Sequence, residues 1–178
     1  MSTRMNDRGV VEAQIGRPPR SVIGVAHRCH LDLPVVIEVP PLLDDGTPFP
    51  TLYWLTCPLA SKRIGRIEAA GGVRTAEQML ADDPALREVY NDAMDRYRDD
   101  RDAQIPDGYQ GHRPTGGVGG TRAGVKCLHA HYADTAAGNN NPIGAWTAEQ
   151  IEPLDCTTTC VAAVDGQWSR NPAWTEPR

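Results

Sequence analysis

The stretch VKCLHAHYA, residues 125–133, carries one of the five cysteines and two of the five histidines of the chain. Thiolate sulfur and imidazole nitrogen are donor atoms that zinc prefers, and thiol enzymes use the same two residue types as nucleophile and base. If the stretch is helical, Cys127 and His131 share one face, whereas His129 points roughly 160° away from His131. A non-helical first turn would relax that separation. Metal binding, catalysis and simple packing are therefore the three hypotheses for this stretch.

Two more cysteines lie at the ends of predicted elements. Cys57 follows a threonine at a predicted helix start, where Cys127 has an analogous place, and the positive end of a helix favours the thiolate. Cys29 lies in HRCHLDLP, between two predicted strands. With His131 these three cysteines make a possible Cys₃His zinc site, for which His129 is the alternative ligand. An iron–sulfur cluster is the less favoured cofactor, because its ligands are usually four cysteines.

The remaining two cysteines, Cys156 and Cys160, form the only close cysteine spacing, C-x₃-C. No C-x-x-C pair occurs, so the spacing alone is a weak metal signal. The two can supply a fourth ligand or form a separate pair. The competing hypothesis is that the cysteines are buried, reduced and act as small hydrophobic residues.

An enzyme is the second hypothesis for this chain, with Cys127 as nucleophile or metal ligand and His129 as its base. The run GGVGGTRAGVK precedes a predicted helix, as phosphate-binding loops do, and Arg113, Arg122 and Lys126 could bind an anionic or phosphorylated substrate there. The run lacks the pattern G-x-x-x-x-G-K-[ST], so a flexible loop is favoured. No G-x-S-x-G or H-E-x-x-H motif is present.

Composition restricts the partners and the compartment. The net charge is −5, which argues against a general nucleic-acid binder. No apolar run approaches the ~20 residues that span a bilayer, and the N-terminus lacks a hydrophobic signal core. We therefore expect a cytoplasmic protein without a membrane span, in which stable disulfides are disfavoured.

The hydrophobic pattern predicts strands in SVIGVAH, in PVVIEVP (34–40) and in TLYWLT (51–56), the last two paired antiparallel. Helices are predicted after Cys57, from Thr75, from Asp83-Pro84, over 126–137 and from a capping box at Thr147 and Gln150, with a hairpin turn at Asp165-Gly166. The predicted fold is α+β, a small and mainly antiparallel sheet covered by three or four helices.

Seventeen glycines and fifteen prolines indicate many turns and long loops. We expect a disordered N-terminal arm over 1–20, a single globular domain over 21–165 and a C-terminal tail over 166–178. Within the domain, the glycine-rich segment 99–124 lacks periodicity and is predicted to be a mobile loop, either a lid or a tether.

Taken together, RCHLDLPVVIEVPPLLDDGTPFPTLYWLTCP, the glycine-rich segment, VKCLHAHYA and GNNNPIG resemble an actinobacterial-type family, domain of unknown function number 501. The resemblance covers roughly residues 20–145 and is most specific in TLYWLTCP and VKCLHAH. It singles out Cys29, Cys57 and Cys127, with His129 and His131, and so favours the metal site, to which we assign a structural or regulatory role. Cys156 and Cys160 lie mostly outside the resemblance and rank below these three cysteines.

The resemblance implies no established activity. Members are often encoded near a septum-formation-initiator-like protein and an exopolyphosphatase. That neighbourhood motivates a third hypothesis, a metal-free interaction module that binds a protein partner in cell-envelope or division control.

Overall fold

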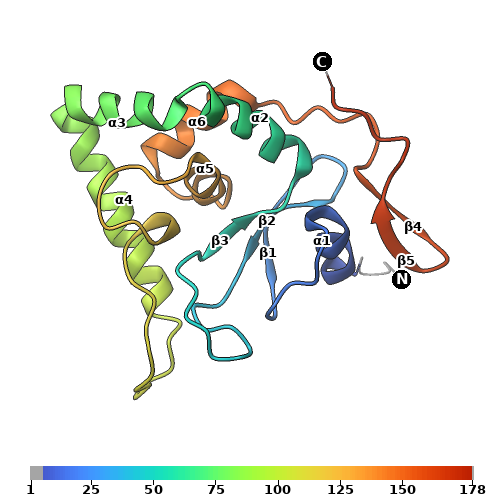
Figure 1. Cartoon of the computed structure of the whole chain (residues 1–178), viewed down its shortest axis with the longest axis horizontal. Coiled ribbons are helices and arrows are strands. Elements are labelled where there is room, and N and C mark those ends of the chain that lie inside the picture. Colours follow the sequence, from blue (N-terminus) through green and yellow to red (C-terminus); the bar gives the residue numbers. More distant parts are fainter. Residues whose placement is uncertain (1–5, 178) are drawn as a thin grey trace.

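A computed structural model describes residues 6–177 of the chain (Figure 1). Helices and two small antiparallel sheets alternate along it, which confirms the α+β class. The strands are β1 (Gly24–Arg28), β2 (Pro34–Glu38), β3 (Tyr53–Leu55), β4 (Val161–Val164) and β5 (Gln167–Arg170). The helices are α1 (Asp7–Ile15), α2 (Pro58–Ala69), α3 (Gly72–Asp82), α4 (Pro84–Asp102), α5 (Leu128–Ala136) and α6 (Pro142–Ile151), and a 3₁₀ turn covers Val118–Gly120.

The larger sheet has the order β1-β2-β3, and its antiparallel pairing confirms the predicted ribbon of β2 and β3. Successive side chains of a strand point to opposite faces, so the central strand β2 is buried on both sides. Ile37 packs in one cluster with Val11 of α1, whereas Val36 joins the main core with Leu59 and Leu128. The sheet therefore has helices on both faces, α1 on one and α2 with α5 on the other.

Residues 7–15 form α1, so the prediction of a disordered arm is wrong for this segment; residues 1–5 lie outside the described part. The helix begins where Asn6 accepts a hydrogen bond from the Gly9 amide and ends at Gly16, in the left-handed region at φ 75°. A nine-residue helix is marginal alone, and burial of Val10 and Val11 stabilises it. The segment is polar in composition, so its sequence does not reveal that Val10 and Val11 pack against the rest of the fold.

The segment predicted as a mobile loop from residue 99 begins later, because α4 continues to Asp102. Arg101 is fully buried near the end of α4 and donates hydrogen bonds to the carbonyls of Gly116, at 2.7 Å, and Pro114, at 3.4 Å. Gly117 packs against Met94 so closely that an added Cβ would lie 2.6 Å from the methionine methyl group. Side chains of α4 therefore hold residues 114–117 against the helix.

Two predicted helix starts are wrong. Thr75 lies inside α3, which begins at Gly72, and Thr147 lies inside α6, whose N-cap is Asn141. The start at Asp83-Pro84 is confirmed: the Asp83 carboxylate accepts from the amides of Ala85 and Leu86. None of these helices, over residues 6–177, is both long and apolar enough to cross a membrane.

The C-terminal segment contributes the hairpin of β4 and β5, which turns at Asp165-Gly166 as predicted. Its strand β5 lies against α1, and Val161 shares a small core with Val10 and Leu33. Figure 1 shows this hairpin beside α1, away from α3 and α4. The segment predicted as a tail is thus partly structured.

Candidate functional site

Cys127 and His129 meet at the start of α5, and Glu68 reaches them from the last turn of α2. Cys127 is the N-cap residue, with an extended backbone at φ −157° and ψ 121°. Side chains two residues apart in a helix point in nearly opposite directions. Cys127 precedes the helix, so this rule does not separate it from His129. Its Sγ lies 3.7 Å from Nδ1 of His129.

The third side chain of this group is the carboxylate of Glu68. Its Oε1 lies 3.2 Å from Nδ1 of His129. One ligand atom from each of Glu68, Cys127 and His129 lies within 4.8 Å of the other two. Sulfur, nitrogen and oxygen atoms therefore converge on a space where a metal ion can contact all three.

Backbone groups orient the two polar side chains. Nε2 of His129 lies 3.1 Å from the carbonyl oxygen of Ser61, so this nitrogen carries the proton and donates. The Leu128 amide, at the first position of α5, donates to Oε1 of Glu68 at 2.7 Å. That bond satisfies one of the unpaired amides that a helix start leaves and fixes the carboxylate beside the imidazole.

The charges around His129 favour its protonated form. Burial alone would lower the pKa, but the contact with Cys127, the negative charge of Glu68 and the Ser61 carbonyl raise the pKa of His129 to about 9. Both ring nitrogens face acceptors, which explains the direction. The same acceptor groups would favour a metal cation in place of the proton on Nδ1.

An open cavity of about 430 Å³ gives access to this group. Cys127 and His129 lie on its wall, while Glu68 approaches from behind them and does not line it. The rest of the wall combines aromatic, aliphatic and hydroxyl groups with one ammonium: Thr51, Tyr53, Trp54, Leu55, Ser61, Gly119, Lys126 and Ala130. A small molecule can therefore reach the sulfur and the imidazole from solvent.

His131 lies apart from this group, in the core. Its side chain is fully buried, and Nδ1 accepts a hydrogen bond from Nδ2 of Asn141 at 3.0 Å. The other nitrogen, Nε2, has no partner among residues 6–177. Burial lowers the pKa of His131 to about 4, so the ring is neutral at pH 7.

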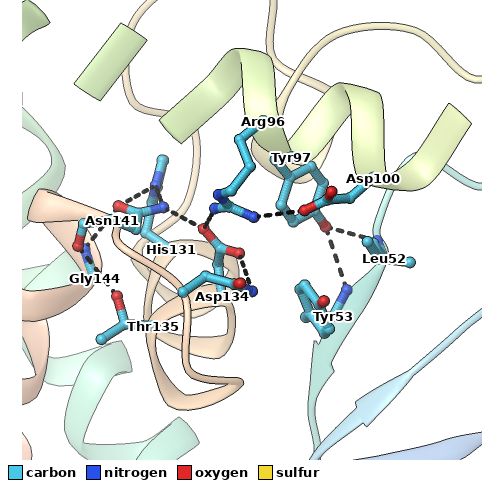
Figure 2. A network of polar contacts seen from close by, with 11 residues as sticks. Leu52, Tyr53, Arg96, Tyr97, Asp100, His131, Asp134, Thr135, Asn141 and Gly144 are labelled. Carbon is cyan, nitrogen blue, oxygen red and sulfur yellow. Dashed lines mark hydrogen bonds and ion pairs between the residues drawn. The ribbon is translucent and has the colours of Figure 1, made fainter. Parts of the chain in front are cut away.

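Asn141 connects His131 to a buried network that Figure 2 shows. Its Oδ1 accepts from the Gly144 amide at the start of α6, and its Nδ2 also contacts Asp134 at 3.0 Å. Asp134 forms an ion pair with Arg96 of α4 at 2.6 Å. The network joins α4, α5 and α6 and holds the His131 ring in the core.

Cys29 and Cys57 line a different, smaller cavity together with Cys156 and Cys160. The predicted Cys₃His set of Cys29, Cys57, Cys127 and His131 is therefore not assembled. The expectation of a thiolate at Cys57 also needs correction. Burial raises the pKa of Cys57 to about 12, against the opposing effect of the amides of Leu59 and Ala60.

The three predicted anion-binding residues do not gather at one point. Arg113 donates to the carbonyl of Tyr109, Arg122 to the hydroxyl of Thr115, and Lys126 to the carbonyl of Gly119. Arg122 borders a cavity beside α4, whereas Lys126 borders the cavity of Cys127. Lys126 alone is placed to attract an anion toward the candidate site.

Comparisons with known proteins identify a family but no characterised relative. No curated protein and no solved structure matches the chain. A family model described as "Protein of unknown function (DUF501)" matches residues 25–149, which include Glu68, Cys127 and His129. The matched range covers more than half of the sequence, and the chain therefore belongs to this family.

Proposed function

We propose that the protein binds one zinc ion through Glu68, Cys127 and His129 and keeps a fourth coordination position open to the cavity. The observation that carries this proposal is the convergence of the three ligand atoms within 4.8 Å at the wall of an accessible cavity. Structural zinc sites have four protein ligands, whereas catalytic sites have three and leave one position for water or substrate. A set of three ligands favours the second kind.

The contacts behind the ligands support the proposal. A histidine that ligates a metal usually donates its other N–H to a carbonyl or carboxylate, as Nε2 of His129 does to Ser61. Nδ1 is then the nitrogen that faces both Cys127 and Glu68. The Leu128 amide holds the carboxylate in place before any metal arrives.

The cavity suggests the chemistry. A zinc ion with an open position polarises a bound carbonyl or lowers the pKa of a bound water. Lys126 adds a positive charge at the cavity wall, and Tyr53 with Trp54 adds aromatic surface. We therefore propose a metal-assisted reaction, such as hydrolysis, on a small anionic substrate with an apolar part.

Elemental analysis of Cys127→Ser tests this function. We expect the variant to lose one zinc per chain relative to the unmodified protein, both purified without chelator, because the serine hydroxyl is a poor zinc ligand. The secondary structure, measured by circular dichroism, should stay unchanged, since Cys127 makes no capping hydrogen bond with the described residues. Unchanged zinc content would contradict the proposal.

A thiol enzyme is the second candidate, favoured by the acceptors at both nitrogens of His129. His129 lies beside Cys127, where it would act as the base for a cysteine nucleophile. The two candidates differ in their response to alkylating reagents. A metal-bound Cys127 is protected until chelator is added, whereas a free nucleophile reacts rapidly and selectively in the native protein.

A further inference from the structure

Four of the five cysteines line one small cavity that is distinct from the open site. Cys29 follows β1, Cys57 is the N-cap of α2, and Cys156 and Cys160 lie between α6 and β4. The cavity measures about 20 Å³. This volume accommodates one water molecule or one ion and not a larger ligand.

The surroundings of these sulfurs contain donors suited to thiolates. The Trp174 indole donates to Sγ of Cys156 at 3.4 Å, and Nε2 of Gln14 donates to Sγ of Cys160 at 3.7 Å. N–H groups directed at sulfur are typical of the residues around metal-bound cysteines. Gln14 is 3% exposed and lines the cavity, yet its Oε1 has no hydrogen-bond partner in the described part of the chain. A buried amide oxygen without a partner favours a polar occupant of this cavity over purely apolar packing.

Simple packing accounts for these observations less well. A single buried cysteine acts as a small hydrophobic residue, but here four thiols from three distant segments share one cavity. All five cysteines of the described chain are free, so no disulfide explains the gathering. Four cysteine sulfurs are one of the common ligand sets of closed structural zinc sites.

We infer that Cys29, Cys57, Cys156 and Cys160 bind one zinc ion in a closed tetrathiolate site, separate from the site of Glu68, Cys127 and His129. Each thiol releases its proton to solvent on coordination, and the positive ion compensates the thiolate charges. The small volume of the cavity selects a single ion over an iron–sulfur cluster.

The sulfurs must move closer to bind zinc. Among residues 6–177, no three of the four lie within 4.8 Å of one another, whereas Zn–S distances of ~2.3 Å place tetrahedral sulfurs about 3.8 Å apart. Cys57 and Cys160 are buried, but Cys29 and Cys156 are half-buried and belong to connecting segments. Closure on the ion would therefore come from the segments that carry these two cysteines.

A zinc ion here would link the C-terminal segment to the part of the chain that the family model matches. Cys156 and Cys160 lie beyond the matched range 25–149, whereas Cys29 and Cys57 lie within it. A two-stranded hairpin such as β4-β5 is marginally stable alone. The metal would therefore hold this hairpin, and α1 packed on it, against the larger sheet.

Elemental analysis of the full chain tests the inference. We expect Cys156→Ser/Cys160→Ser to lose one zinc per chain, and Cys127→Ser, the matched control, to keep that zinc. X-ray absorption of zinc in Cys127→Ser should show four sulfurs at about 2.3 Å. Unchanged zinc content in the double variant, a zinc-free Cys127→Ser protein, or a disulfide within the group would each overturn the inference. The two variants report on the two sites separately, so failure of one proposal is distinguishable from failure of the other.

A second measurement leaves the four cysteines unmodified, because the double variant can lose its fold. Cys127→Ser protein is treated with iodoacetamide with and without chelator, and modified residues are identified by mass spectrometry. We expect Cys29 and Cys156, which are half-buried, to be protected until the chelator removes zinc. Their rapid modification without chelator would overturn the inference.

Discussion

Nδ1 of His129 lies 3.2 Å from Oε1 of Glu68, although the two residues come from α5 and α2. This contact places a carboxylate beside the Cys127–His129 pair and completes a group of three side chains that could hold a metal ion. The Leu128 amide donates to the same Oε1 and fixes its position. The contact between helices, and not the local sequence, therefore creates the candidate metal site.

Glu68→Gln should weaken zinc binding at this site by at least about tenfold, because the amide oxygen keeps the bond from Leu128 but loses the negative charge. Competition with a chromophoric chelator measures the dissociation constant. Glu149→Gln, an exposed carboxylate on α6, is the matched control and should leave the constant unchanged. Equal affinities of the Glu68 variant and the control would remove Glu68 from the ligand set.

Asn141→Ala should lower the free energy of unfolding by about 3 kcal/mol, because it leaves the Gly144 amide and Nδ1 of His131 without their buried partner and removes one of the hydrogen bonds that Asp134 accepts. Urea denaturation measures the change. Asp83→Ala removes an exposed cap of α4 and should cost only about 1 kcal/mol. Similar losses in both variants would show that the network around Asn141 adds no stability beyond the cap.

The pH dependence of stability should report on His131. Its folded pKa of about 4 lies below the unfolded value of 6.5, so the unfolded state binds the proton more readily. This contribution to stability is present above pH 6.5 and is lost as the pH falls toward 4, about 2 kcal/mol between pH 7 and pH 5. Comparison of urea midpoints with those of His131→Gln isolates this residue. An equally steep loss in the variant would contradict the assignment.

Arg101→Lys should loosen the segment that follows α4. A lysine cannot reproduce the forked donation to the Gly116 and Pro114 carbonyls. Hydrogen exchange at the Gly117 amide, which donates to Thr121, should become at least several-fold faster. Arg98→Lys, on an exposed part of the same helix, is the control and should leave this exchange unchanged. Identical exchange in both variants would show that Arg101 does not hold the segment.

Local signals predicted much of the fold. The β-branched run of β2, the Asp83-Pro84 start of α4 and the Asp165-Gly166 turn all have short-range causes, and the structure confirms each. Helix α1 was missed because its stability depends on Val10 and Val11 packing against distant strands. Thr75 and Thr147 match capping patterns, but the preceding Gly71 and Asn141 begin those helices.

The candidate site was predictable only in part. The VKCLHAH stretch indicated Cys127 and His129, because both chemical types occur within three residues. Glu68 carries no local signal, since it is one carboxylate among many on helix surfaces. The grouping of Cys29 and Cys57 with Cys156 and Cys160, instead of with Cys127, depends on how the C-terminal segment returns to the sheet.

The most direct test of the central claim is the zinc content of His129→Asn, measured by mass spectrometry beside His112→Asn and the unmodified protein. His112 is exposed and lies outside the candidate site, so its variant controls for the loss of a histidine. The account predicts that His129→Asn loses one zinc per chain and that His112→Asn loses none. Equal zinc content in all three proteins would contradict zinc binding by Glu68, Cys127 and His129.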